Sequence, residues 1–224
     1  MKKRHLLIEF LLIFFFIVLP PVFASKGMPL PGSSLASAAA ECVIAFFLQL
    51  QHIRAHAFPK RTKKEQFSAA VRGLCWGAVC LGTLMIIFAA VQALSLAAGA
   101  GHAAQSPVQF DSAGISAWIC MAASLAAGAF FEEVLYRQYL PETVKELAGS
   151  GRKAAVWEAE LISAAAFALA HRYLGWIAVF NAALCGASLR ICREKTGSVY
   201  AGAAAHFVYN STLVLFSVLL EKVV

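Results

Sequence analysis

The chain consists of long apolar segments separated by short polar stretches. A helix that crosses a bilayer needs about 20 apolar residues, and segments of that length recur along the whole sequence. Their hydrophobicity is continuous rather than alternating, which argues against a transmembrane β-barrel. The pattern predicts seven membrane-spanning helices, over residues 6–24, 35–53, 73–98, 115–138, 155–171, 174–191 and 198–220.

The composition agrees with a chain that is mostly membrane helix. Of the 224 residues, 60% are hydrophobic and 14% are charged, and the mean hydropathy is +0.71. Soluble domains average about 45 to 50% apolar and about 25% charged residues. Seven spans use about 140 residues, which leaves no room for a large soluble domain in this sequence. We therefore predict an all-α fold, a polytopic membrane helix bundle of about seven transmembrane helices.

The basic residues are distributed unevenly among the predicted loops. With the N-terminus inside, 16 of the 19 Lys and Arg residues face the cytoplasm, which is the bias that orients membrane proteins. We expect an integral protein of the plasma membrane with its N-terminus inside. The net charge of +7 does not indicate a nucleic-acid partner, because five basic residues gather in one predicted cytoplasmic loop. These are Arg54, Lys60, Arg61, Lys63 and Lys64.

The first predicted span has two readings. The basic residues 2–4, the apolar stretch after them and the small-residue site at 22–24 resemble a cleavable secretory signal. We favour a retained helix, because Pro20 and Pro21 end the apolar run. Both readings leave the orientation of the other spans unchanged.

Charged residues cluster near the inner end of the fourth span, where a bilayer makes them costly and where they usually mark function. Glu133 and Arg137 are four residues apart, so they share a helix face and can pair. Glu132 points elsewhere and has no Lys or Arg one turn on. An unpaired carboxylate beside a second acid suits a general base. The alternative is an interfacial Glu132 that reaches water.

Two further polar patterns repeat the four-residue spacing on later spans. Phe167 precedes His171 by one helical turn, and His206 precedes Asn210 by one turn. A single histidine on an apolar helix is more often a packing group or an interhelical hydrogen bond. Several such groups on three helices each need a partner in hydrocarbon. One wet cavity satisfies them together.

The residue types favour one chemistry for peptide hydrolysis. Asp111 is the only aspartate, which excludes a paired-aspartate mechanism, and no histidine is followed by glutamate as in the HExxH zinc proteases. No GxSG or GxSxG string supports a serine nucleophile. What remains is a carboxylate with histidines acting on water. Glu132 and His171 would deprotonate the water, while His206 and Asn210 would stabilise the oxyanion.

These patterns resemble a known family. EExxxR over 132–137, FxxxH over 167–171 and HxxxN over 206–210 occur in that order on successive apolar helices, and the turn at 195–200 precedes the last motif. Together they are similar to the CAAX prenyl protease and bacteriocin-processing (CPBP, or Abi) group of membrane proteins. The resemblance covers about 112–220. It divides the chain into N-terminal helices without a specific motif (1–111) and a catalytic helix bundle (112–224).

The resemblance implies a metal-independent, glutamate-dependent intramembrane endopeptidase without a cofactor. Glu132 would activate water with help from His171, and His206 and Asn210 would form the oxyanion hole. Glu133 and Arg137 would hold the motif helix in place. The implied partners are the lipid bilayer and a membrane-associated peptide or protein, such as a prenylated or bacteriocin-like substrate. The substrate itself and the oligomeric state stay open.

The depths of the motif residues present a problem. If the fifth span starts at Lys153, His171 lies about 27 Å further along it, whereas Glu132 is only about 8 Å from Arg137. We therefore expect an amphipathic interfacial helix within 142–160, a membrane segment that begins near Leu161, and a turn at 171–175.

Other readings of the same residues are a zinc hydrolase with Glu132, His171 and His206 as ligands, a transporter or proton relay, and a non-catalytic scaffold. Replacing Glu132 by Gln separates a protease from a scaffold. Four further polar residues have simpler interpretations. Glu41 faces lipid or a polar partner, Asn181 lines the cavity, and His52 with His56 are solvated residues beside the basic loop.

Overall fold

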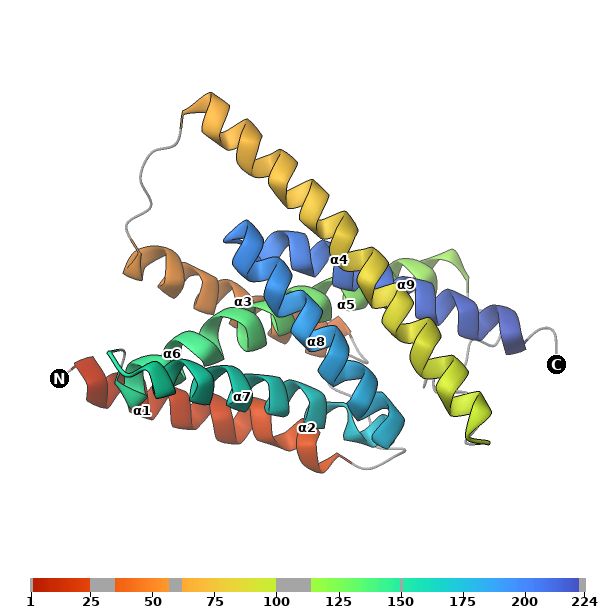
Figure 1. Ribbon diagram of the computed structural model, residues 1–224, viewed down its shortest axis with the longest axis horizontal. Coiled ribbons are helices and arrows are strands. Elements are labelled where there is room, and N and C mark those ends of the chain that lie inside the picture. Colours follow the sequence, from red (N-terminus) through yellow and green to blue (C-terminus); the bar gives the residue numbers. More distant parts are fainter. Residues whose placement is uncertain (1, 25–34, 57–61, 100–113, 150, 222–224) are drawn as a thin grey trace.

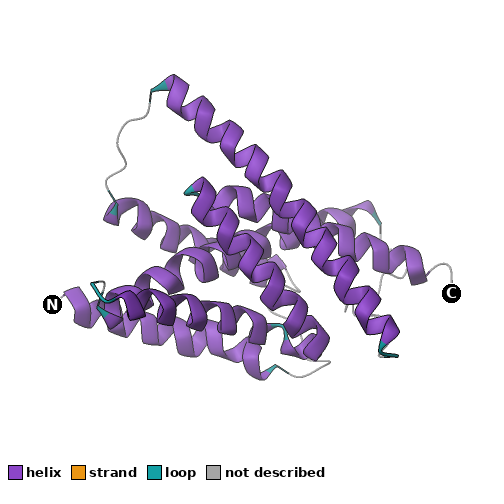
Figure 2. Cartoon of the chain, viewed as in Figure 1, coloured by secondary structure: helices purple, strands orange, loops and turns teal. Residues whose placement is uncertain are grey.

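A computed structural model describes residues 2–24, 35–56, 62–99, 114–149 and 151–221, and these residues form helices and turns without strands (Figure 2). Each predicted span corresponds to a helix or a helical run, so the predicted all-α bundle is confirmed. The helices are α1 (Lys2–Ile13), which continues through η1 (Phe14–Val18) and α2 (Leu19–Phe23), α3 (Leu35–Ala55), α4 (Lys63–Ala97), α5 (Ile115–Val134), η2 (Leu135–Tyr139), α6 (Leu140–Ala148), α7 (Lys153–Ala170), η3 (Arg172–Leu174), α8 (Trp176–Thr196) and α9 (Val199–Glu221).

Six helical runs within the described residues are long and apolar enough to cross a membrane. α8 corresponds to the remaining predicted span but does not reach the same hydropathy, because its last two turns contain Arg190, Arg193, Glu194 and Lys195. Charges at a helix end are tolerated where the chain meets water. The protein is therefore an integral membrane protein.

α5 runs through the middle of the bundle (Figure 1), with α3 and α9 packed along it. One buried cluster surrounds its C-terminal end and joins it to α1, α3 and α7 through Phe131, Leu135 and Phe167, among others. A second cluster lies where α4 crosses α8 and α9, and includes Leu84 and Leu189. The helix that carries EExxxR is thus packed on several sides, which restricts how its acidic side chains point.

The amphipathic helix expected within 142–160 is present, although it begins two residues before that range. It is α6, which buries Leu140 and Val144 and exposes Glu142 and Lys145. α7 is one uninterrupted helix from Lys153 to Ala170 instead of an interfacial helix followed by a membrane segment.

The depth problem is resolved by the length of the motif helix, which does not end at Arg137. η2 and α6 extend it to Ala148, so Glu132 lies about 24 Å from the end of that run, and His171 lies about 27 Å from the start of α7. α6 packs against α7, so both residues come to similar depth. The turn expected at 171–175 is present. It consists of η3 and Gly175, whose φ of 101° is in the region that glycine tolerates.

Candidate active site

The EExxxR segment contains a change of helix type. α5 ends at Val134, and the next five residues form the π-helical turn η2, in which every residue is buried. Single π turns inside α-helices occur frequently at functional sites. Here the π turn lies between Glu133 and the amphipathic α6, and it carries Arg137.

Glu133 is the fully buried member of the acidic pair. Its Oε1 lies 3.4 Å from Arg137 Nε, as the four-residue spacing predicts. The same oxygen lies 3.3 Å from His206 Nδ1 of α9, a contact that the sequence did not indicate. Gly202, one turn before His206, leaves the space for this carboxylate, because a Cβ there would stand 2.9 Å from Glu133 Oε2.

The Arg137 guanidinium lies over an aromatic ring. Its Cζ is 3.7 Å from the centre of the Phe167 ring, which is a cation–π geometry. Gly186 of α8 makes this stack possible, because a Cβ there would come within 3.0 Å of the Phe167 ring. Phe167, the first residue of FxxxH, therefore fixes the arginine and, through it, Glu133.

Glu132 is the accessible acid of the pair. About 30% of its side chain is exposed, and its Oε2 lies 3.7 Å from His206 Nε2. His206 is thus held by Glu133 at Nδ1 and faces Glu132 with Nε2. The imidazole links the two acids, which the sequence could only place on different helix faces.

His171 ends α7 and has a defined hydrogen bond. Its Nδ1 lies 2.8 Å from the Phe167 carbonyl oxygen. A carbonyl only accepts, so Nδ1 donates the proton and Nε2 keeps its lone pair. The His171 ring contacts Phe167 at 4.8 Å between centroids, and the charge of Glu132 acts on it. The Phe167 ring thus lies beside both imidazoles, since the His206 ring centroid is 6.3 Å from it, and Glu132 faces His206.

The last motif residue is placed less closely. Asn210 is half-buried on α9, one turn beyond His206. Asn181, expected to line the cavity, donates from Nδ2 to the Tyr209 hydroxyl at 3.0 Å, and within the described residues its Oδ1 is buried without a hydrogen bond. An amide oxygen left in that condition is an acceptor available to water or substrate.

Sequence reasoning missed Glu41 as a neighbour of this site. Its Oε2 lies 3.6 Å from the Cβ position of Gly128, one turn before Glu132, so it faces α5 and not lipid. The charges of Glu41 and Glu132 act on one another, and among the described residues Glu41 Oε2 is buried without a hydrogen bond. Two features of the sequence could have indicated this contact: an acid within a predicted span, and a glycine, Gly128, four residues before Glu132.

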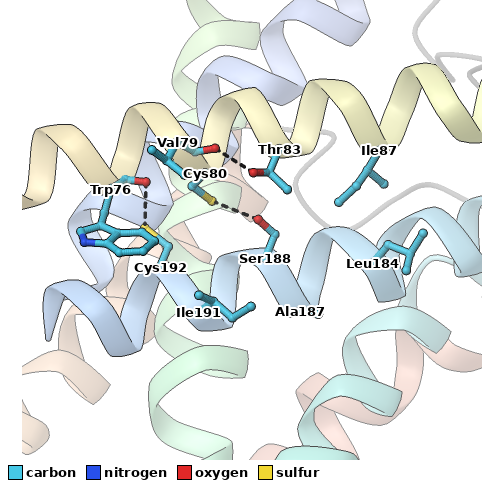
Figure 3. Close-up of a pocket in the computed structure, with 10 residues that line it drawn as sticks. All are labelled: Trp76, Val79, Cys80, Thr83, Ile87, Leu184, Ala187, Ser188, Ile191 and Cys192. Atoms are coloured by element: carbon cyan, nitrogen blue, oxygen red, sulfur yellow. Dashed lines mark hydrogen bonds between the residues drawn. The ribbon is translucent and has the colours of Figure 1, made fainter.

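A groove separate from these residues lies between α4 and α8, as Figure 3 shows. It has a volume of about 290 Å³ and a mostly apolar wall. Two buried thiols border it: Cys80 Sγ lies 3.7 Å from Ser188 Oγ, and Cys192 Sγ donates to the Trp76 carbonyl at 3.7 Å. No motif residue lines it.

The comparisons with known proteins agree with the motifs. Residues 113–212 match a protein family described as type II CAAX prenyl endopeptidase Rce1-like. The matched region contains all three motifs and begins just before α5. A search of curated proteins and a search of solved structures found no match.

Proposed function

We propose that this chain, whose residues 113–212 are of the Rce1-like family of type II CAAX prenyl endopeptidases, is an intramembrane endopeptidase that uses a water activated by Glu132. The observation that carries the proposal is the approach of Glu132 Oε2 to His206 Nε2, at 3.7 Å, between helices that cross the membrane. Glu132 is also the less buried acid of the motif, and among the described residues its Oε2 is buried without a hydrogen bond, so this oxygen is free to take a proton from a water.

Hydrolysis begins with a water between Glu132 and His171. The Glu132 carboxylate takes one proton, and the free Nε2 of His171 accepts a hydrogen bond from the other, which orients the oxygen. The resulting hydroxide attacks the peptide carbonyl carbon. When the tetrahedral intermediate breaks its C–N bond, the Glu132 carboxylic acid returns the proton to the leaving amine. No bond forms between enzyme and substrate.

The oxyanion of the intermediate needs donors that are already oriented. His206 supplies Nε2–H in the doubly protonated form, in which Nδ1–H points to the Glu133 carboxylate, and Asn210, one turn further along α9, supplies its amide N–H groups. Glu133 and Arg137 are positioning residues. Glu133 holds His206 at Nδ1 and is itself held by Arg137. This division explains why one acid of the pair is accessible and the other is fully buried.

The substrate is a membrane-associated peptide or protein, of the prenylated or bacteriocin-like kind. An active site within a membrane helix bundle favours substrates that already lie in the membrane. The distribution of basic residues favours the plasma membrane with the N-terminus inside, and α6 then lies at the cytoplasmic surface.

The test uses the full chain in lipid nanodiscs with a farnesylated C-terminal peptide and its unprenylated counterpart. We expect cleavage that Glu132→Gln lowers by about 100-fold or more, the range of a lost general base. Glu146→Gln, at an exposed acid of α6, is the matched control. Cleavage by Glu132→Gln at the wild-type rate would refute the proposal.

A chelation experiment distinguishes a zinc hydrolase from the metal-independent mechanism with Glu132. Within the described residues, the donor atoms of Glu132, His171 and His206 do not form a set within 4.8 Å of one another, which is looser than a zinc ligand shell. We expect the cleavage rate to survive exhaustive chelation. Loss of activity that zinc restores would make the three residues metal ligands.

A further inference from the structure

Two histidines at the end of α3 meet an acid of α6 outside the catalytic centre. His52 and His56 are four residues apart on the last turn of α3 and just beyond it, and their rings lie 4.3 Å apart between centroids. Glu142, in the first turn of α6, places Oε2 2.9 Å from His52 Nδ1. In Figure 1 α3 and α6 both run toward the left of the view, the side on which α4 begins.

We propose that His52, His56 and Glu142 form a binding site for a zinc ion that links α3 to α6. One donor atom from each residue lies within 4.8 Å of the other two. Ligands around a tetrahedral zinc stand about 3.4 Å apart, so side-chain rotations close the set without movement of the helices. Two imidazoles and one carboxylate favour zinc over magnesium or calcium, which prefer oxygen ligands.

The surroundings orient the donors as metal sites require. His56 Nδ1 lies 3.0 Å from the His52 carbonyl oxygen, so Nδ1 donates and Nε2 is the ligand atom. Glu142 Oε1 faces Arg193 of α8 at 3.5 Å, which holds the carboxylate, and Oε2 would exchange its contact with His52 Nδ1 for the metal. Such outer contacts fix ligand orientation in known metal sites. His56 and Glu142 are exposed, so a water completes the coordination.

A zinc ion at this site would support the helix that carries EExxxR and would not take part in peptide hydrolysis. Gln138, one residue after Arg137, donates to Gln49 of α3 at 2.8 Å in the interior. His52 and Glu142 lie about one turn beyond this pair at the same helix contact. A zinc ion there would reinforce the contact between α3 and the helix that carries EExxxR.

The positive charge nearby limits the affinity. Arg54 lies on the same turn of α3, and Arg193 shares Glu142. Zinc also competes with the proton that lets His52 pair with Glu142. We therefore expect a dissociation constant on the order of micromolar.

The experiment titrates the full chain in detergent with zinc against a fluorescent zinc indicator, with metal content measured by mass spectrometry. We expect one zinc per chain, and a loss of affinity of about 100-fold in His52→Gln and in His56→Gln, since each removes a ligand. His5→Gln, at an exposed histidine of α1, is the matched control. His206→Gln separates this site from a zinc ion at the catalytic residues, and should bind as the wild type does.

A measurement without variants covers the case of a poorly folded mutant. Zinc should protect His52 and His56 of the wild-type chain from diethyl pyrocarbonate, with modification mapped by peptide mass spectrometry. Absence of zinc binding, unchanged binding in both α3 variants, or loss of binding in His206→Gln alone would overturn the proposal. The first two outcomes do not bear on Glu132, because this site does not depend on the proposed function. Loss of binding in His206→Gln alone would place the zinc at the catalytic residues instead.

Discussion

The same substitution, glutamate to glutamine, should change the stability of the fold by very different amounts at the two adjacent acids of EExxxR. Glu133 has a fully buried side chain, 3.4 Å from Arg137 Nε and 3.3 Å from His206 Nδ1. Glu133→Gln keeps the shape and leaves the Arg137 charge uncompensated. Breaking a buried pair in this way costs about 3 to 5 kcal/mol. In a chain of this size that lowers the midpoint of thermal unfolding by about 6 to 20 °C.

Glu132→Gln should leave the fold almost unchanged. The Glu132 side chain is about 30% exposed, and its Oε2 lies 3.7 Å from His206 Nε2 but is buried without a hydrogen bond among the described residues. Glu132→Gln keeps the shape and breaks no hydrogen bond, so we expect it to cost about 1 kcal/mol or less. The midpoint should move by less than about 4 °C. Both variants are measured in one detergent with a thiol-reactive dye after the three thiols that are not buried, Cys42, Cys75 and Cys120, have been replaced by serine. The dye then reports unfolding when the buried thiols of Cys80, Cys185 and Cys192 become exposed.

A double variant tests the cause of the loss. Adding Arg137→Gln to Glu133→Gln removes the uncompensated charge, so it should recover part of the stability, as a coupled pair requires. Equal stability of Glu132→Gln and Glu133→Gln would refute the assignment of one acid to the chemistry and the other to the support of the helix. So would a double variant less stable than the sum of the single changes.

Three further predictions follow from close contacts in the bundle. Gly202→Ala forces a Cβ to within 2.9 Å of Glu133 and should cost about 1 to 3 kcal/mol, whereas Gly82→Ala on α4, with nothing within 4 Å, should raise stability by about 0.5 to 1 kcal/mol; similar midpoints in thermal unfolding would contradict this. Gly186→Ala should lower stability by the same overpacking range of about 1 to 3 kcal/mol and slow cleavage, because it pushes the Phe167 ring from the Arg137 stack; an unchanged rate would count against that role of the ring. Glu41→Gln should raise stability by about 1 kcal/mol, since it removes a carboxylate whose buried oxygen lacks a hydrogen bond within the described residues, while lowering the cleavage rate; a less stable variant would show that Glu41 is satisfied.

The sequence predicts the helices well because lipid leaves few alternatives. A backbone in hydrocarbon must satisfy its own hydrogen bonds, so each long apolar run becomes a helix. The pair of Glu133 with Arg137 follows from helical spacing alone. The turn at 171–175 was predicted from the depths of the motif residues, and it is present although the membrane segment assumed in that argument is not.

Contacts between helices could not be predicted in the same way. The contact of Glu133 with His206, the approach of Glu41 to α5 and the length of the run that ends in α6 depend on how distant segments pack. The π turn over 135–139 leaves no mark in the hydrophobic pattern. The expectation of a membrane segment beginning near Leu161 failed for this reason, since it assumed that the motif helix stops at Arg137.

The most direct test of the central claim compares cells that carry the wild-type chain with cells that carry Glu132→Gln at equal abundance, using mass spectrometry of membrane-protein fragments. Because Glu132→Gln keeps the fold, a difference reports chemistry and not loss of the protein. We predict fragments with new termini within or beside membrane segments in the wild type, absent from the variant and unchanged in Glu146→Gln. The same fragments at the same abundance in Glu132→Gln cells would contradict the account of Glu132 as the residue that activates water.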